Sequence, residues 1–98
     1  MDRYVIEYIR DELTKNGLKF DYYANNFFFN VTDVEGIVQT LSASTMKAGL
    51  RMSNKSYAKT YWVSGYSLKD FIRLCKNPEL RKSIYIECRD SLAEGGNS

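Results

Sequence analysis

The side chains with the most recognisable chemistry form a run of small hydroxyls and cations in the middle of the chain. They are Ser44, Thr45, Lys47, Arg51, Lys55 and Lys59. Residues 44–82 hold nine basic side chains and only two acidic ones, for a net charge of +7. Residues 1–43 are net −3 and residues 83–98 net −2. A basic middle with acidic flanks predicts a polyanion or an acidic protein as partner, and a merely solvated basic face is the equal alternative.

Catalytic chemistry finds little support in the residue types. The chain contains no histidine, which removes Ser-His and Cys-His nucleophile activation and most zinc sites. Cys75 and Cys88 have neither C-x-x-C nor Cys/His spacing, so buried, reduced thiols are the favoured prediction over a disulfide. No glycine spacing predicts a phosphate-binding loop. We therefore expect no metal or other cofactor, and no enzyme.

Length and composition predict one small domain. Ninety-eight residues with 44% hydrophobic content suffice for a single core over residues 1–92, followed by a flexible tail, AEGGNS, over residues 93–98. No apolar run approaches the ~20 residues of a membrane span, and the N-terminus has acids where a signal peptide has an apolar centre. A cytoplasmic protein is expected.

The order of expected elements indicates the α+β class. A helix over residues 2–15 comes first, then a hairpin of residues 18–23 and 27–31, a helix pair over residues 32–51, a short β-ribbon over residues 57–63, and two helices that begin near Ser67 and Pro78. No strand–helix–strand pattern repeats, which argues against an α/β fold. The hairpin is rich in aromatic rings; packing on the first helix is the favoured explanation, and a base-stacking platform for single strands is the alternative.

The helix pair is predicted from a cap and a periodicity. Thr32 and Glu35 have the capping-box spacing. Four apolar residues then recur at i, i+3, i+4 and i+7, the spacing of one helical face: Val34, Ile37, Val38 and Leu41. Ser42 is a second capping candidate, and the segment after it would carry Ser44, Thr45, Lys47 and Arg51 on its polar side.

Residues 31–74 resemble the phage excisionase and MerR-type winged helix-turn-helix family in the segments VTDVEGIVQTLSASTMKAGLRM, KTYWV and SLKDFI. The resemblance implies a small regulatory protein of phage or mobile-element type that reads double-stranded DNA with a helix and a wing. It places Ser44, Thr45, Lys47 and Arg51 on the groove-facing side of the recognition helix, with Arg51 able to contact guanine. It places Lys55 and Lys59 on the wing against phosphates. Gly49 departs from this pattern, because a glycine inside a helix costs roughly 1 kcal/mol relative to alanine.

A second hypothesis is a small phage- or plasmid-type protein that binds and inhibits a host or defence enzyme. Tyrosine and tryptophan are favoured anchors of protein interfaces. The contact surface would then consist of four aromatic residues interleaved with two lysines: Tyr57, Tyr61, Trp62, Tyr66, Lys55 and Lys59. For Trp62 itself, contact is the alternative and a core position is favoured. Trp62 is predicted to lie in the core, on the less polar side of the strand alternation.

The last expected helix carries more apolar residues than one stripe needs. Leu80, Ile84, Cys88 and Leu92 are four apart, whereas Tyr85 and Ile86 fall off that stripe. A homodimer through this helix is one explanation, and a position wrapped by the core is the other.

Overall fold

The computed structural model describes the backbone of residues 2–95 and the side chains of residues 2–92. Its elements are α1 (Arg3–Lys15), β1 (Lys19–Tyr23), β2 (Phe28–Thr32), β3 (Val38–Ser42), β4 (Lys47–Leu50), β5 (Tyr61–Ser64), α2 (Leu68–Lys76) and α3 (Pro78–Gly95). The predicted α+β class is confirmed. The predicted arrangement within that class is wrong in the middle of the chain, where strands replace helices.

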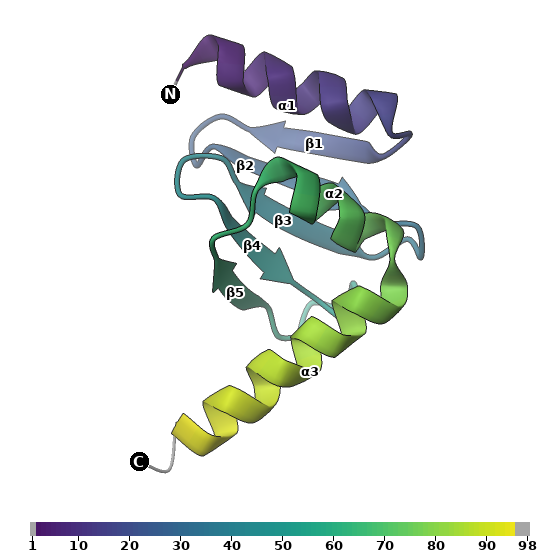
Figure 1. The fold of residues 1–98 in the computed structure, drawn as a ribbon, viewed down its shortest axis with the longest axis vertical. Helices are drawn as coiled ribbons and strands as arrows, with labels where there is room; N and C mark the ends of the chain where they lie inside the picture. Colours follow the sequence, from purple (N-terminus) through teal and green to yellow (C-terminus); the bar gives the residue numbers. More distant parts are fainter. Residues whose placement is uncertain (1, 96–98) are drawn as a thin grey trace.

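The five strands form one antiparallel sheet in the order β1-β2-β3-β4-β5, so each strand pairs with its neighbour in the sequence. All three helices lie on one side of this sheet: α2 in front of its middle, α1 along β1, and α3 running past β5 and beyond it (Figure 1). Within residues 2–95, no helix covers the opposite side of the sheet.

The core lies between the sheet and the helices. Alternate residues of the inner strands point into it and are buried, among them Phe29, Val31, Leu41 and Leu50. From the helices, Ile9, Leu13, Phe71 and Leu74 complete the same cluster. Burial of this kind contributes roughly 25 cal/mol per Å² of apolar surface, so alternation along the strands decides which side of the sheet faces the core.

The N-terminal helix, the first hairpin and the two C-terminal helices are confirmed because each has a strong local signal. Asp2 caps α1 by accepting from the backbone N–H of Tyr4 at 2.9 Å, and Ser67 caps α2 by accepting from Asp70. Pro78 opens α3 at the position where its missing N–H costs nothing. α3 continues to Gly95, so the predicted domain boundary at residue 92 falls inside this helix. Residues 96–98 of the predicted tail lie outside the described residues, and the tail's flexibility stays a prediction.

The predicted helix pair over residues 32–51 is wrong. Its supposed capping box is a turn between β2 and β3: the carboxylate of Asp33 accepts from the backbone N–H groups of Glu35 and Ile37, both at 2.9 Å. Gly36 has φ +83, a left-handed conformation that turns the chain back and does not continue a helix. Val34, assigned to the buried helical face, is 57% exposed. The helical spacing of the apolar residues was coincidental.

The predicted ribbon over residues 57–63 is right only at its end, because β5 begins at Tyr61. The predicted side of the alternation is reversed. Tyr61 and Val63 face the helices, opposite Leu50 and Ala48, while Trp62 points away and is 46% exposed. The placement of Trp62 in the core is therefore wrong.

Within residues 2–95, none of the helices combines the length and the apolar character needed to cross a membrane.

Candidate functional site

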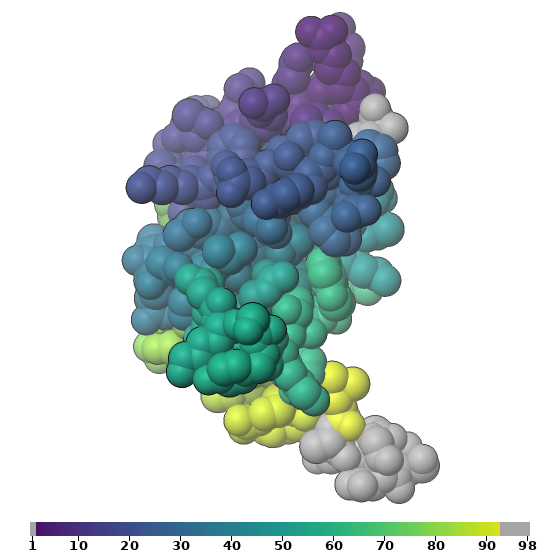
Figure 2. All heavy atoms as spheres, turned by 180° about the vertical axis from the view of Figure 1, so that it is seen from behind, coloured from purple at the N-terminus to yellow at the C-terminus, as the bar shows by residue number. Residues whose placement is uncertain are grey.

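The side of the sheet opposite the helices, here named the open face, carries the second set of alternating side chains. Strand register assigns to it Lys19, Asp21, Tyr23, Phe28, Asn30, Thr32, Val38, Thr40, Ser42, Lys47, Gly49, Trp62 and Ser64. Figure 2 shows the molecule from this side, where the connection between β4 and β5, in teal-green, stands out from the surface. Most of the residues that the sequence singled out lie on or beside this face.

Two aromatic rings meet on the open face although two strands separate them in the sheet. The rings of Phe28 on β2 and Trp62 on β5 have centroids 5.4 Å apart and planes inclined by 40°. This ring pair is possible because the residues beneath it are small: Phe28 pairs with Ser42, and Trp62 pairs with Gly49.

Gly49 is needed here for space, since its backbone does not have a positive φ. A Cβ at this position would lie 3.1 Å from Cη2 of Trp62 and 3.1 Å from Cγ2 of Thr60. The indole therefore lies across β4 against a bare backbone. An isolated glycine in a strand is a sequence signal for such a close approach.

Beside the ring pair lies a hollow of ≈ 430 Å³, here named the hydroxyl hollow, lined by Phe28, Ser42, Ser44, Thr45, Lys47 and Trp62. Its lining surface is mainly apolar, with the Phe28 and Trp62 rings beside three hydroxyl side chains and Lys47. Thr45 Oγ1 donates to Ser42 Oγ at 2.8 Å. The structure thus brings together three predicted site residues, Ser44, Thr45 and Lys47, through a turn between strands and not through a recognition helix.

Arg51 follows β4 and turns its side chain to the open face. Its NH1 donates to the carbonyl of Val38 at 3.2 Å and to Thr40 Oγ1 at 2.8 Å, both neutral groups. The guanidinium forms no ion pair with a described residue. Burial lowers the pKa of Arg51, because desolvation disfavours its charge.

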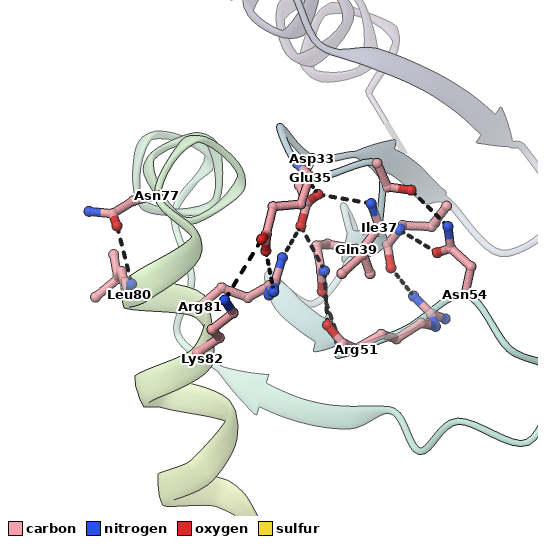
Figure 3. A network of polar contacts seen from close by, with 12 residues as sticks. Asp33, Glu35, Ile37, Gln39, Arg51, Asn54, Asn77, Leu80, Arg81 and Lys82 are labelled. Carbon is pink, nitrogen blue, oxygen red and sulfur yellow. Dashed lines mark hydrogen bonds and ion pairs between the residues drawn. The ribbon is translucent and has the colours of Figure 1, made fainter.

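Gln39 holds the backbone of Arg51. Pairing between β3 and β4 stops at Thr40 and Gly49, and the Gln39 side chain continues it: its Oε1 accepts from the Arg51 N–H at 2.8 Å and its Nε2 donates to the Arg51 carbonyl at 3.0 Å. The same Nε2 also donates to Asp33 Oδ2 at 3.1 Å (Figure 3).

Asp33 and Arg81 complete this buried network on the helix side. The carboxylate of Asp33 accepts from Glu35, Ile37, Gln39 and Arg81, so its lone pairs are well satisfied. The guanidinium of Arg81, on α3, also pairs with Glu35 at 2.7 Å, while its Nε is buried without a hydrogen-bond partner among the described residues. Nothing local in the sequence relates residues 33 and 81, so sequence reasoning missed this network.

The other predicted site residues lie elsewhere. Lys55, Tyr57 and Lys59 belong to the connection between β4 and β5, where the ammonium of Lys55 lies 5.7 Å from the centre of the Tyr57 ring. Asn54 ties this connection to the turn before β3 by accepting from Val38 N at 2.8 Å and donating to the Gly36 carbonyl at 2.7 Å. Tyr61 faces the helices, with its ring centroid 4.9 Å from that of Tyr85. It does not join the open face.

The charges of the open face are unbalanced. The sequence has no acidic residue between Glu35 and Asp70, whereas the part of this stretch before α2 holds Lys47, Arg51, Lys55 and Lys59. Among the side chains described, none of these four cations forms an ion pair. The acid that register places on this face is Asp21, on the distant strand β1.

α3 leaves a further apolar surface. Ile86 and Leu92 are exposed, and a hollow of ≈ 420 Å³ is lined by Tyr61, Trp62, Glu87, Cys88, Ser91 and Leu92. A homodimer through this helix stays a prediction that light scattering can test. Cys75 is buried and Cys88 half-buried, and both are free thiols as predicted.

Among the side chains that the structure describes, residues 2–92, no three or more of the Cys, Asp and Glu groups gather where they could hold a metal ion. Comparison of the chain with protein-family models, curated proteins and solved structures gives no match.

Proposed function

We propose that the open face binds single-stranded nucleic acid. The observation that carries the proposal is the Phe28–Trp62 ring pair, in which Trp62 is exposed and Phe28 half-buried, with cations nearby that pair with no described carboxylate. Proteins that bind single strands combine a cationic track for the backbone with aromatic side chains on which bases stack, each stacked base contributing about 1–3 kcal/mol. Both parts are present on one surface here.

The hydroxyl hollow suits a base or a sugar edge. Its aromatic wall offers a stacking surface, and Ser44 and Thr45 place hydroxyl donors and acceptors at the rim. Lys47 lies at the same rim, where a neighbouring phosphate would be neutralised. We therefore propose a binding role for Ser44 and Thr45 in the turn between β3 and β4, and for Lys47 at the start of β4.

A single strand is a better candidate than the duplex that the winged-helix resemblance implied. The recognition helix on which that reading depended is replaced by β3 and β4. Bases inside a duplex are already stacked on each other and cannot reach a ring on a flat sheet, whereas bases of a single strand can be splayed out. Double-stranded DNA remains an arm of the test.

An acidic protein, such as a host or defence enzyme that this chain would inhibit, is the competing partner. Exposed Tyr57 and Trp62 are suitable protein anchors, and the ammonium of Lys55 lies beside the Tyr57 ring. Such a partner would depend on Tyr57 at least as much as on Phe28, because Tyr57 is the most exposed ring on this side of the molecule.

Trp62 is the single tryptophan of the chain, so its intrinsic fluorescence reports directly on the site. We would titrate the protein with single-stranded DNA, single-stranded RNA and duplex DNA of about 12 nucleotides or base pairs, over a salt series. Heparin serves as a polyanion without bases. The expected result is quenching by one or both single strands, with an affinity that falls steeply as salt rises.

Two variants complete the test. Lys47→Ala should flatten the salt dependence by about 0.7 in the logarithmic slope, the effect of one lost phosphate contact on a single strand. Arg73→Ala, which removes an exposed cation from α2 on the other side, is the matched control. Tighter binding of the duplex, or heparin binding as well as the oligonucleotides without quenching, would contradict base stacking. Absence of any nucleic-acid binding would leave the acidic protein partner.

A further inference from the structure

We propose that Arg51 is a phosphate anchor of the open face and that the buried side chain of Gln39 sets its position. The inference rests on the proposed function and extends it, because it assigns the second phosphate contact and the residue that positions it.

Two cations, Lys47 and Arg51, lie at the beginning of β4 and directly after its end. Lys47 and Gly49 alternate onto the open face, and the Arg51 side chain reaches Thr40 on the same face. The Cα atoms of Lys47 and Arg51 are four residues apart, or about 13 Å along an extended chain; the guanidinium itself turns toward Val38 and Thr40 on β3. The indole of Trp62 lies over Gly49, between them. A backbone whose base stacks on Trp62 therefore meets one cation on either side.

The guanidinium of Arg51 is held in place by one of its nitrogens and has donors left for a ligand. NH1 of Arg51 is occupied by two neutral acceptors, which fix the plane of the group. Nε and NH2 donate to no described residue, and no described carboxylate balances the charge. The group is partly desolvated without a counter-charge, so a phosphate that accepts from the free Nε–NH2 edge supplies both hydrogen bonds and charge.

Buried side chains on the helix side of the sheet hold the backbone of Arg51. Gln39 is fully buried, and both the oxygen and the nitrogen of its side-chain amide form hydrogen bonds with the Arg51 backbone. Asp33 holds the Gln39 amide, and Arg81 of α3 holds Asp33. Figure 3 shows this continuous set of contacts from α3 to Arg51. Gln39 points into the interior and cannot touch a ligand, so its effect on binding must pass through Arg51.

Four variants of the full chain test the inference by titration with the single strand that binds best: Arg51→Ala, Arg51→Lys, Gln39→Met, and the double variant Gln39→Met/Arg51→Ala. Arg51→Ala should weaken binding about tenfold or more, the weight of a charge-assisted hydrogen bond, and should lower the salt slope by about 0.7. Arg51→Lys should keep the slope and lose affinity, because the ammonium keeps the charge and loses the planar fork.

Gln39→Met keeps the length of the side chain and removes its hydrogen bonds. In the folded protein it should weaken binding and lower the salt slope as Arg51→Ala does. The double variant should bind as Arg51→Ala alone, since Gln39 has nothing left to position. A merely structural role of Gln39 would leave the slope unchanged and multiply the two losses, which would overturn the positioning claim.

A second variant covers the case in which Gln39→Met does not fold. Thr40→Val keeps a β-branched side chain and removes the hydroxyl that accepts from Arg51 NH1 and donates to Asn30 Oδ1 at 2.6 Å. Asn30→Ala, which removes only the bond to Asn30, is therefore its control. Thr40→Val should weaken binding in the wild-type background and have no effect in the Arg51→Ala background. If Arg51→Ala binds like the Arg73→Ala control while Trp62→Ala loses binding, the anchor is wrong and the proposed function stands. If Trp62→Ala also binds normally, the proposed function falls.

Discussion

Arg81 and Arg51 lie on opposite sides of the same sheet, and their guanidinium groups have contrasting surroundings. Arg81 is 1% exposed and pairs with two carboxylates, those of Asp33 and Glu35. Arg51 is only partly buried and donates to a carbonyl and a hydroxyl, and it pairs with no carboxylate that the structure describes. The charge of Arg81 is neutralised inside the fold, whereas the charge of Arg51 is not neutralised by any described carboxylate and lies near the surface.

The difference separates charges that hold the fold from charges available to a ligand. A buried ion pair is costly to break because the remaining partner is left uncompensated in the interior. An unpaired surface cation costs the fold little and raises the local concentration of anions. The two arginines are nevertheless ends of one network, since Gln39 and Asp33 lie between them. The helix side thus positions what the open face presents.

The largest expected effect is on the helix side. Arg81→Met should lower the free energy of unfolding by roughly 3–5 kcal/mol, because it leaves the Asp33 carboxylate buried without its cation. Urea denaturation followed by circular dichroism measures this. Arg89→Met, which breaks the exposed pair with Asp90, is the matched control and should cost about 1 kcal/mol or less. Equal costs for the two variants would mean that the buried network does not hold the fold.

The next effect is on the open face and concerns binding. Trp62→Ala should weaken single-strand binding by about 1–3 kcal/mol, the contribution of one stacked base. Its effect on stability should be smaller, because nearly half of the side chain is already exposed to water. Fluorescence anisotropy of a labelled oligonucleotide measures binding, and Tyr4→Ala, an exposed ring on α1, is the control. A stability loss without a binding loss would reverse the roles given to the two sides.

Local signals predicted the elements that local interactions decide. The caps at Asp2, Ser67 and Asn77-Pro78 and the alternation of the first hairpin gave α1, α2, the start of α3, and β1–β2. The centre failed because two local signals conflicted. The helical spacing after Thr32 competed with Gly36 at positive φ, and sheet pairing decided the outcome.

The candidate site depends on contacts that are distant in sequence, which explains why only part of it was predictable. Ser44, Thr45 and Lys47 were predicted from their polar side chains and from the winged-helix resemblance, which placed them on a helix where the structure has a turn and β4. Phe28 and Trp62 join them only because pairing through β3 and β4 brings residues 28 and 62 together. Gly49 was treated as a defect of a helix, although a lone glycine beside aromatic strand residues also fits a ring lying on the backbone.

The close approach of the Trp62 ring to Gly49 predicts a third, smaller effect on binding when this glycine is substituted. Gly49→Ala should weaken binding by about 1 kcal/mol, because the added Cβ displaces the Trp62 ring. The emission of Trp62 should shift in the free protein, which steady-state fluorescence detects. The substitution should have no further effect in the Trp62→Ala background. A loss of binding in that background would show that Gly49 acts on the backbone and not on the ring.

The smallest effect tests whether the two sides are energetically separate, with Cys75 as the reporter. Its thiol is buried on the helix side, and its carbonyl accepts from the backbone N–H of Val34, next to Asp33. Burial, and to a lesser degree the charge of Asp33, raises the pKa of Cys75 from 9.0 to about 12. The folded state therefore keeps this proton where the unfolded chain loses it. The stability contributed by the neutral thiol is complete below pH 9 and is lost as the pH rises toward 12.

At about pH 8, a thiol reagent should therefore modify the half-buried Cys88 first and reach Cys75 only when the helix side opens. Trp62→Ala and Arg51→Ala should leave the modification rate of Cys75 unchanged, because they alter only the open face. Arg81→Met should raise that rate, because it loosens α3 from the turn that holds Asp33. If the open-face variants accelerate Cys75 as much as Arg81→Met does, the two sides open as one unit. Arg81 and Arg51 would then differ in how their charges are neutralised, but the two sides of the sheet would not differ in the free energy of opening.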